Sequence, residues 1–209
     1  MNKDYRILEV RAVEGGARLL VKLEASDGEC CERETLSLLC ARLSRLPRIG
    51  AVNRETVQEL RREAQICAAI EAGLRALGAA GASRRRLTEK LRVRGYDREI
   101  AATAVELLAE KGYLKEEEGA IREAEKGLAK LWGDRRILAD LHAKGYGEEA
   151  LCAVRELLAG KDGAARLVRL LEKRHFDTEN TDKLIAALMR YGYTRTEIRA
   201  ALREVMEDE

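Results

Sequence analysis

Three Gly-Tyr dipeptides, each lying between two amphipathic segments, constrain the fold of this chain more than any other feature of the sequence. They are Gly95-Tyr96, Gly145-Tyr146 and Gly192-Tyr193, so the second follows the first by 50 residues and the third follows the second by 47. Glycine readily adopts the left-handed conformation that ends many helices, and an apolar residue just after it packs back onto the helix. We therefore predict three structural corners with positive φ at each glycine.

The segments before the corners share their apolar positions as well. Counted back from each glycine, one core position holds Leu87, Ile137 and Leu184, and the next holds Leu91, Leu141 and Leu188. Four-residue spacing is typical of an amphipathic helix, and self-similarity at a fixed period indicates a repeat protein. The basic segment Ser83–Arg94, with Ser83 as its N-cap and Val93 on its apolar side, is the clearest copy.

The repeat predicts a mainly α fold: three tandem three-helix bundles in an elongated array, preceded by a small module with a β-hairpin and a helix. The expected segments are 1–62 for the module and 63–115, 116–160 and 161–209 for the repeats. The first repeat begins with a long helix capped by Asn53 whose apolar stripe includes Leu74, the second with Glu117–Leu131 and the third with Asp162–Lys173. One such bundle buries little core, so neighbouring units are expected to stabilise each other.

The N-terminal segment has a different periodicity. Tyr5–Val13 and Ala17–Leu23 alternate apolar and polar residues around Gly15-Gly16, which predicts a hairpin, and a short third strand is expected to reach Cys31. Leucines at helical spacing then predict a helix over Glu34–Leu46, ended by Pro47.

Composition limits the class of protein. The 209 residues are 46% hydrophobic but 4% aromatic and 36% charged, which is typical of small amphipathic helices. The sequence has neither a membrane-length apolar run nor a signal-peptide pattern, so we expect a cytoplasmic protein.

Catalytic and metal chemistry are not indicated. The two histidines, His142 and His175, have no nucleophile, paired carboxylates or phosphate-binding loop beside them. The five cysteines lack the spacings of zinc or redox sites. We expect no enzyme activity, no cofactor and no metal.

The charge distribution indicates a binding surface although the net charge is +2. Arg84–Arg94 carries six basic residues and one acidic residue, and three adjacent arginines at a helix start could bind phosphates or an acidic protein groove. Solvation of a helix face is the competing explanation. The candidate partner- or DNA-binding residues are Arg84, Arg85, Arg86, Lys90, Arg92, Arg94, Arg135, Arg136, Lys144, Arg190 and Arg195.

The motifs resemble those of the RecX regulatory proteins. The run SRRRLTEKLRVRGY at Ser83–Tyr96, the GYL at 112–114 and GDRRILADLHAKGY at Gly133–Tyr146 are similar to the family's first and second repeats. The N-terminal module is similar to one carried by members from Gram-positive bacteria. Gly119 departs from the family pattern, which has Phe there, and either Trp132 compensates for the missing ring or the joint between repeats is looser.

The resemblance implies a role in recombination, DNA repair and the SOS response. It implies a protein that binds the RecA filament on single-stranded DNA and restrains filament growth, ATP hydrolysis and strand exchange. From the repeat array we expect a monomer, and from the lack of a long apolar run we expect no membrane partner. Single-stranded or duplex DNA is a further candidate partner. The alternative is a helical-repeat DNA-binding protein of helix-turn-helix type that acts without RecA.

Overall fold

The computed structural model describes residues 3–28, 30–78, 82–174 and 181–207. The chain forms two compact units. Unit 1 contains Met1–Ala76 and Leu87–Tyr113, and unit 2 contains Leu77–Arg86 and Leu114–Glu209. Helices predominate, so the predicted mainly α class is confirmed.

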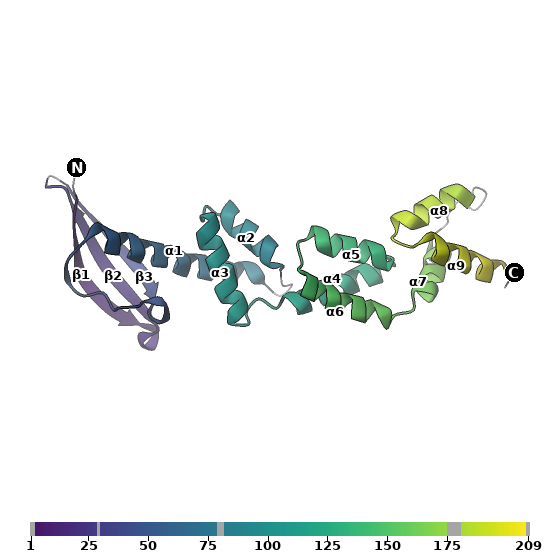
Figure 1. Cartoon of the computed structure of the whole chain (residues 1–209), viewed down its shortest axis with the longest axis horizontal. Coiled ribbons are helices and arrows are strands. Elements are labelled where there is room, and N and C mark those ends of the chain that lie inside the picture. Colours follow the sequence, from purple (N-terminus) through teal and green to yellow (C-terminus); the bar gives the residue numbers. More distant parts are fainter. Residues whose placement is uncertain (1–2, 29, 79–81, 175–180, 208–209) are drawn as a thin grey trace. The chain divides into compact units, whose positions relative to one another are not determined.

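Unit 1 begins with an antiparallel sheet of four strands, whose order is β3-β2-β1-β4 (Figure 1). The strands are β1 (Asp4–Val13), β2 (Arg18–Ser26), β3 (Cys31–Leu39) and β4 (Gly50–Val52). β1 and β2 form the predicted hairpin, and Gly15 and Gly16 have the positive φ angles of its turn. The inward side chains of β1 to β3 form one core with Val57 and Leu60 of the following helix.

The helix predicted over Glu34–Leu46 is wrong. Residues 31–39 form β3, followed by a 3₁₀ turn at Cys40–Arg42. Leu36 and Leu38 are buried on the sheet side, whereas Leu46 is 66% exposed. Pairing with the whole of β2 therefore outweighs the helical spacing of the leucines. The N-terminal module is a four-stranded sheet with a helix packed on it, rather than a hairpin with a helix.

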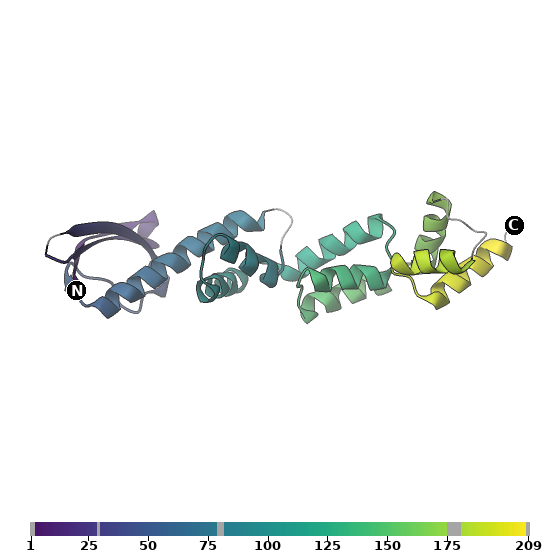
Figure 2. The same ribbon diagram turned by 90° about the horizontal axis from the view of Figure 1, so that it is seen from above.

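The helices α1 (Arg54–Leu77), α2 (Arg84–Val93) and α3 (Arg98–Glu110) follow the sheet in the described chain. They lie in unit 1, except that Leu77 of α1 and residues 84–86 of α2 belong to unit 2. Asn53 caps α1 as predicted, since its side chain accepts a hydrogen bond from the backbone N–H of Thr56 at 2.9 Å. Figure 2 shows α1 running past the sheet and on alongside α3. Its buried stripe continues through Ile66, Ala69 and Ala72, while Leu74 is exposed, contrary to the predicted stripe.

The described residues from 114 onward in unit 2 form six helices, and each set of three shares a hydrophobic core. One core joins α4 (Glu116–Ala129), α5 (Asp134–Ala143) and α6 (Glu148–Ala159). The other joins α7 (Gly163–Lys173), α8 (Thr181–Arg190) and α9 (Arg195–Glu207).

The positive φ angles predicted at the corners are observed. Gly95, Gly145 and Gly192 have φ of 93°, 79° and 98°. Each corner closes its helix with the same two backbone hydrogen bonds, for example Gly145 N–H to His142 C=O at 2.9 Å and Tyr146 N–H to Leu141 C=O at 3.2 Å. This is the Schellman motif, in which a left-handed residue satisfies the last carbonyls of a helix. Val93, two residues before Gly95, is 80% exposed, so the prediction that it lies on the apolar side of its helix is wrong.

Candidate partner-binding surface

The start of α2 is held by its own cap and by α4. The Ser83 hydroxyl accepts from the Arg86 N–H at 3.2 Å, which confirms the predicted N-cap. The Glu116 carboxylate accepts from the Arg84 N–H at 3.0 Å, and its other oxygen lies 3.4 Å from Arg84 Nε. A carboxylate at a helix N-terminus is favourable, so Glu116 offsets the cost of placing arginines there.

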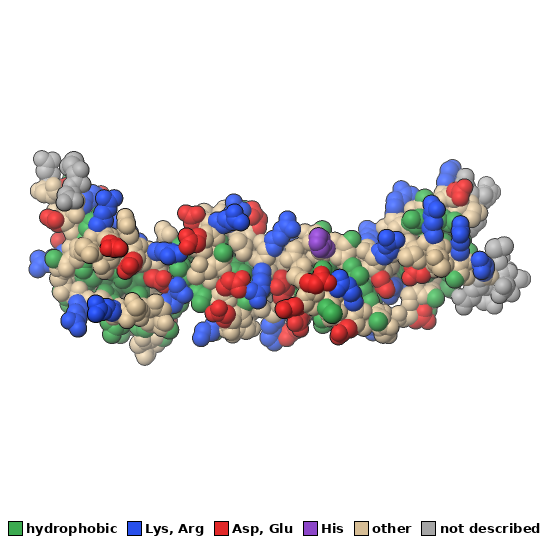
Figure 3. Space-filling view, in the orientation of Figure 1, with side chains coloured by type: hydrophobic (Ala, Val, Ile, Leu, Met, Phe, Trp, Pro, Cys, Tyr) green, Lys and Arg blue, Asp and Glu red, His purple; other side chains and the backbone are tan. Residues whose placement is uncertain are grey.

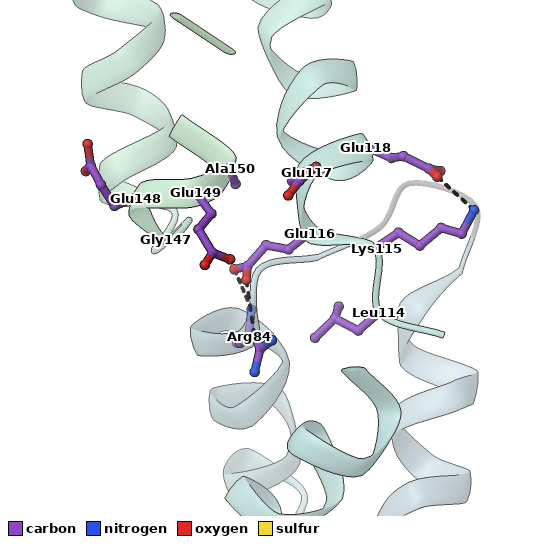
Figure 4. A pocket seen from close by; sticks show the side chains of 10 residues that line it. All are labelled: Arg84, Leu114, Lys115, Glu116, Glu117, Glu118, Gly147, Glu148, Glu149 and Ala150. Atoms are coloured by element: carbon purple, nitrogen blue, oxygen red, sulfur yellow. Dashed lines mark hydrogen bonds and ion pairs between the residues drawn. The ribbon is translucent and has the colours of Figure 1, made fainter. Parts of the chain in front are cut away.

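Arg84 lines an acidic hollow rather than a basic surface (Figure 4). The hollow has a volume of about 670 Å³ and lies between the starts of α2, α4 and α6. Its lining includes five glutamates, Glu116, Glu117, Glu118, Glu148 and Glu149. Because like charges repel, this setting disfavours a phosphate at Arg84.

The next two arginines of α2 are exposed, but one of them also packs. The Cβ, Cγ and Cδ atoms of Arg85 lie under the Gly145 corner, where an added Cβ would stand 2.6–3.0 Å from them. The guanidinium groups of Arg85 and Arg86 make no ion pair within the described residues. Both are available to a partner.

Three further candidates lie in unit 1 and have contacts there. Lys90 Nζ is 3.4 Å from the Ala76 carbonyl, Arg92 pairs with Glu89 at 3.1 Å, and Arg94 donates to the Ala72 carbonyl at 2.9 Å. Arg94 thereby joins the end of α2 to α1. These contacts favour a structural role for Arg94 and partial neutralisation of Arg92.

The two candidate arginines on α5 also differ in exposure and contacts. Arg135 is exposed, whereas Arg136 is half-buried and donates to the Arg190 carbonyl at 3.2 Å. The Arg136 guanidinium lies 4.1 Å from the centre of the Trp132 ring. This short separation is typical of a cation–π contact.

Lys144 is neutralised by the chain itself. Its ammonium lies 2.5 Å from Glu123 and 2.7 Å from Asp140. Hydrogen bonds from Lys126 and Lys144 lower the pKa of Glu123 to about 2. Burial alone would lower the pKa of Lys144, but the hydrogen bonds to Asp140 and Glu123 outweigh it and raise that pKa.

The last two candidates, Arg190 and Arg195, are exposed. Figure 3 shows Lys and Arg side chains gathered over α8 and α9 and acidic side chains over α4 and α6. The basic side chains of α8 and α9 are Lys183, Arg190, Arg195, Arg199 and Arg203. Unit 2 therefore carries acidic and basic regions on different helices.

Two of the corners also serve as joints between helices of unit 2. The Ser83 hydroxyl donates to the carbonyl of Lys144 at 2.6 Å, just before the Gly145 corner. At the Gly192 corner the acceptor is again the carbonyl of the residue before the glycine: the Gly133 N–H donates to the carbonyl of Tyr191 at 2.8 Å. Ser83 and Gly133 both immediately precede a helix, α2 and α5 respectively, so the two joints are built alike.

The corner tyrosines differ in burial. Tyr146 and Tyr193 are buried, and burial raises the pKa of both hydroxyls, while Tyr96 is half-exposed. The Tyr193 hydroxyl donates to the carbonyl of Leu131 at 3.0 Å. Buried aromatic rings with a satisfied hydroxyl usually serve packing.

Gly119 meets a tyrosine rather than a tryptophan. It is buried in α4, and a Cβ added there would stand 3.4 Å from the Tyr146 hydroxyl. Trp132 instead packs near Gly127 at the other end of the same helix. The Tyr146 ring therefore lies beside the position where an aromatic residue was expected.

The sequence reasoning missed three basic residues that line a pocket with Arg136: Lys130, Lys173 and Arg174. They come from two helices far apart in sequence. The signal that could have found Lys130 is its place two residues before Trp132, and the signal for the other two is that Lys173 and Arg174 form an adjacent basic pair.

The described residues show neither a metal-binding cluster nor a membrane-spanning helix. No group of three His, Cys, Asp or Glu side chains there is placed to hold a metal ion. No helix there has both the length and the apolar character required to cross a membrane. His175 lies outside the described residues.

Comparison with solved structures identifies the fold. A crystal structure of regulatory protein RecX superposes with a TM-score of 0.71 over 98% of this chain and 100% of its own, at 16% sequence identity. The chain has the RecX fold. A second structure, RecX from Lactobacillus salivarius, superposes with a TM-score of 0.57 over 67% of this chain and 96% of its own, at 19% identity. No protein-family model and no curated protein matches the sequence.

The RecX fold is thus present in a sequence that shares fewer than one residue in five with each of these two RecX structures. The likeness includes the N-terminal sheet, because the first comparison covers nearly the whole chain.

Proposed function

We propose that this chain is a RecX-family regulator that binds the RecA filament on single-stranded DNA and restrains filament growth, ATP hydrolysis and strand exchange. The observation that carries the proposal is the likeness of fold to a protein described as regulatory over 98% of the chain. The sequence motifs at Ser83–Tyr96 and Gly133–Tyr146 support it independently of the superposition.

The proposal includes an organisation in repeats. A module of residues 1–62 precedes three three-helix repeats at 63–115, 116–160 and 161–209, and the chain acts as a cytoplasmic monomer without a cofactor. The separate cores of α4–α6 and α7–α9 support the last two repeats. Small linked units suit a polymeric partner, because each weak contact raises the effective concentration of the next.

The proposed partner-binding residues differ in the charge that they can offer. Arg85, Arg86, Arg135, Arg190 and Arg195 are exposed. Arg84, Arg92 and Lys144 have carboxylate partners in the chain, while Lys90, Arg94 and Arg136 have carbonyl partners. The guanidinium groups of Arg85, Arg86, Arg135, Arg190 and Arg195 have no such partner among the described residues, so these five are the proposed main contacts for acidic recombinase surface or phosphate.

A recombinase ATPase assay tests the function. The purified chain is titrated into RecA assembled on single-stranded DNA, and ATP hydrolysis is followed. The expected result is a saturable fall in rate at a chain concentration below that of RecA. An unchanged rate at equimolar protein, with the filament intact, would contradict the proposal.

A further inference from the structure

A pocket of about 390 Å³ opens between the end of α4, the start of α5, the end of α7 and the end of α8. Its nine lining residues include four cations, Lys130, Arg136, Lys173 and Arg174, and two aromatic residues, Trp132 and Tyr191. No acidic residue is among them. We call this the cationic aromatic pocket.

The cations and rings of the pocket alternate in space. Lys130 Nζ lies 4.9 Å from the Trp132 ring centre, and the Arg136 guanidinium lies 4.1 Å from the same ring. The Arg136 and Arg174 guanidiniums each lie 5.6 Å from the Tyr191 ring centre. The order is thus Lys130, Trp132, Arg136, Tyr191, Arg174.

The charges of these cations are not offset by neighbouring carboxylates of the described chain. Lys130, Arg136, Lys173 and Arg174 have no carboxylate within ion-pair distance in the described part of the chain. Other basic side chains of unit 2 are paired, for example Lys144 with Glu123 and Arg166 with Asp134. Four cations without a carboxylate partner among the described residues, gathered around one hollow, create a positive potential that attracts anions.

The aromatic rings in the pocket favour an anion that also carries a flat ring. Phosphate alone needs cations, whereas a nucleotide also presents a flat base that stacks on aromatic rings and on guanidinium planes. Stacking requires an unpaired base, because the bases of a duplex already stack on their neighbours. The volume of the pocket lies within the range of small-ligand sites.

We infer that the cationic aromatic pocket binds single-stranded nucleic acid, with a base against Trp132 or Tyr191 and backbone phosphates at Lys130, Lys173 and Arg174. Arg136 has a second task, since it donates to the Arg190 carbonyl and holds the Trp132 ring. The inference goes beyond the proposed function and does not depend on it, because the chain alone should bind the strand without a recombinase.

The acidic hollow in the same unit has the opposite charge to the cationic aromatic pocket. It is larger, at about 670 Å³, but five glutamates line it together with Arg84 and Lys115. A nucleic acid strand is expected to avoid that hollow and to bind at the cationic aromatic pocket.

The test uses the chain's only tryptophan, Trp132, as a local probe. An oligothymidylate of about 15 nucleotides, long enough for one binding site, is titrated into the full chain. Stacking on Trp132 should quench its fluorescence with the same midpoint as anisotropy of the labelled strand. Absence of quenching while anisotropy rises would overturn the pocket as the site, and absence of both signals would overturn binding.

A charge-matched pair of variants tests the residues. Lys130→Gln, Lys173→Gln and Arg174→Gln combined should weaken binding about tenfold or more and reduce the slope of log affinity against log salt by about 2. The control combines Lys161→Gln, Arg169→Gln and Arg199→Gln, which are exposed in unit 2 and do not line the pocket. Equal losses in both variants would overturn the inference.

Two competitors separate the ligand classes. A duplex of the same length should quench Trp132 more weakly than the single strand, and polyglutamate should not displace the strand at equal charge concentration. Displacement by polyglutamate would reassign the pocket to an acidic peptide. Equal quenching by the duplex would show that base stacking plays no part. The quenching of the unaltered chain decides these points even if a variant fails to fold.

Discussion

Gly133 and Gly147 each precede a helix of unit 2 in nearly the same extended conformation, but their surroundings differ. Their φ/ψ angles are −72°/159° and −74°/169°. A Cβ on Gly133 would stand 2.5 Å from the backbone carbon and oxygen of Gly192, whereas a Cβ on Gly147 would meet nothing within 4 Å among the described residues. The joint at Gly192 therefore depends on the absence of a side chain at Gly133.

Gly133→Ala should lower the free energy of unfolding by about 2–4 kcal/mol, because backbone atoms of a packed corner cannot move aside as a flexible side chain can. Gly147→Ala is the matched control and should cost less than about 1 kcal/mol, since it changes the cap alone. Urea denaturation followed by circular dichroism measures both. Equal losses of unfolding free energy in the two variants would contradict the requirement for glycine at position 133.

Gly119 has the opposite expectation. An alanine Cβ there would stand 3.4 Å from the Tyr146 hydroxyl, which is an ordinary contact, so Gly119→Ala should stabilise α4 by about 0.5–1 kcal/mol. Gly119→Phe should destabilise the chain because its ring would enter the space beside Tyr146. Thermal melting of the two variants checks the difference in sign. A stabilising Phe would mean that the joint has room for a second ring.

The local residues of the corners could be predicted from sequence, but their partners could not. A glycine at the end of a helix adopts positive φ for reasons contained within six residues. The neighbour of Gly119 is Tyr146, 27 residues away, and the sequence offered Trp132 as an equally reasonable candidate.

At the scale of elements, β3 shows where periodicity misleads. Leu36, Leu39, Leu43 and Leu46 fit a helix, while Leu36 and Leu38 fit the inner face of a strand. The strand forms because residues 31–39 pair with the whole of β2. Such pairing depends on residues outside the segment, so the local sequence pattern does not reveal it. The helices of unit 2 were easier to predict because their caps, stripes and glycines all agree.

A pair of leucine variants tests the strand. Leu38 is fully buried in the sheet core, so Leu38→Ala should cost about 2–5 kcal/mol. Leu46 is 66% exposed, so Leu46→Ala should cost less than about 0.5 kcal/mol. Denaturant unfolding measures both. The helical interpretation predicts the reverse order, because there Leu46 faces the core and Leu38 does not.

The ion cluster that joins α4 to α5 should make stability depend on pH. The pKa of Glu123 is lowered to about 2. Its contribution to the free energy of unfolding is therefore complete above its ordinary pKa and is lost as the pH falls from about 4.5 toward 2. Glu123→Gln should therefore cost about 2 kcal/mol at pH 7, with a difference from the parent that shrinks below pH 4.5. Glu125→Gln, an exposed neighbour on α4, is the control. A difference that stays constant from pH 7 to pH 3 would mean that charge is not involved.

At the scale of the whole molecule, the net charge of +2 conceals the distribution that matters for binding. Sequence alone located the basic residues but could not tell which were already paired. Glu116, which pairs with Arg84, and Glu123, which pairs with Lys144 beside the local Asp140, come from α4, more than 20 residues away in sequence. The exposed Arg85 and Arg86 carry the remaining charge of the triple-arginine run.

The proposed regulation of a recombinase should therefore depend on Arg85 and Arg86 rather than on the whole run. Substituting Glu for both should leave the melting temperature nearly unchanged, because exposed positions cost little, although Arg85 also packs its stem beneath Gly145. Arg84 is left intact, since Arg84→Glu would add a carboxylate beside Glu116 in the acidic hollow. In the ATPase assay the double variant should need about tenfold more protein for half-maximal inhibition at low salt, and the difference from the parent should narrow as salt screens the contact.

A second double variant, Arg169→Glu with Arg199→Glu, is the control. It has the same change of charge at exposed positions and should inhibit like the parent. If both double variants lose inhibition equally, the effect comes from net charge and not from the start of α2.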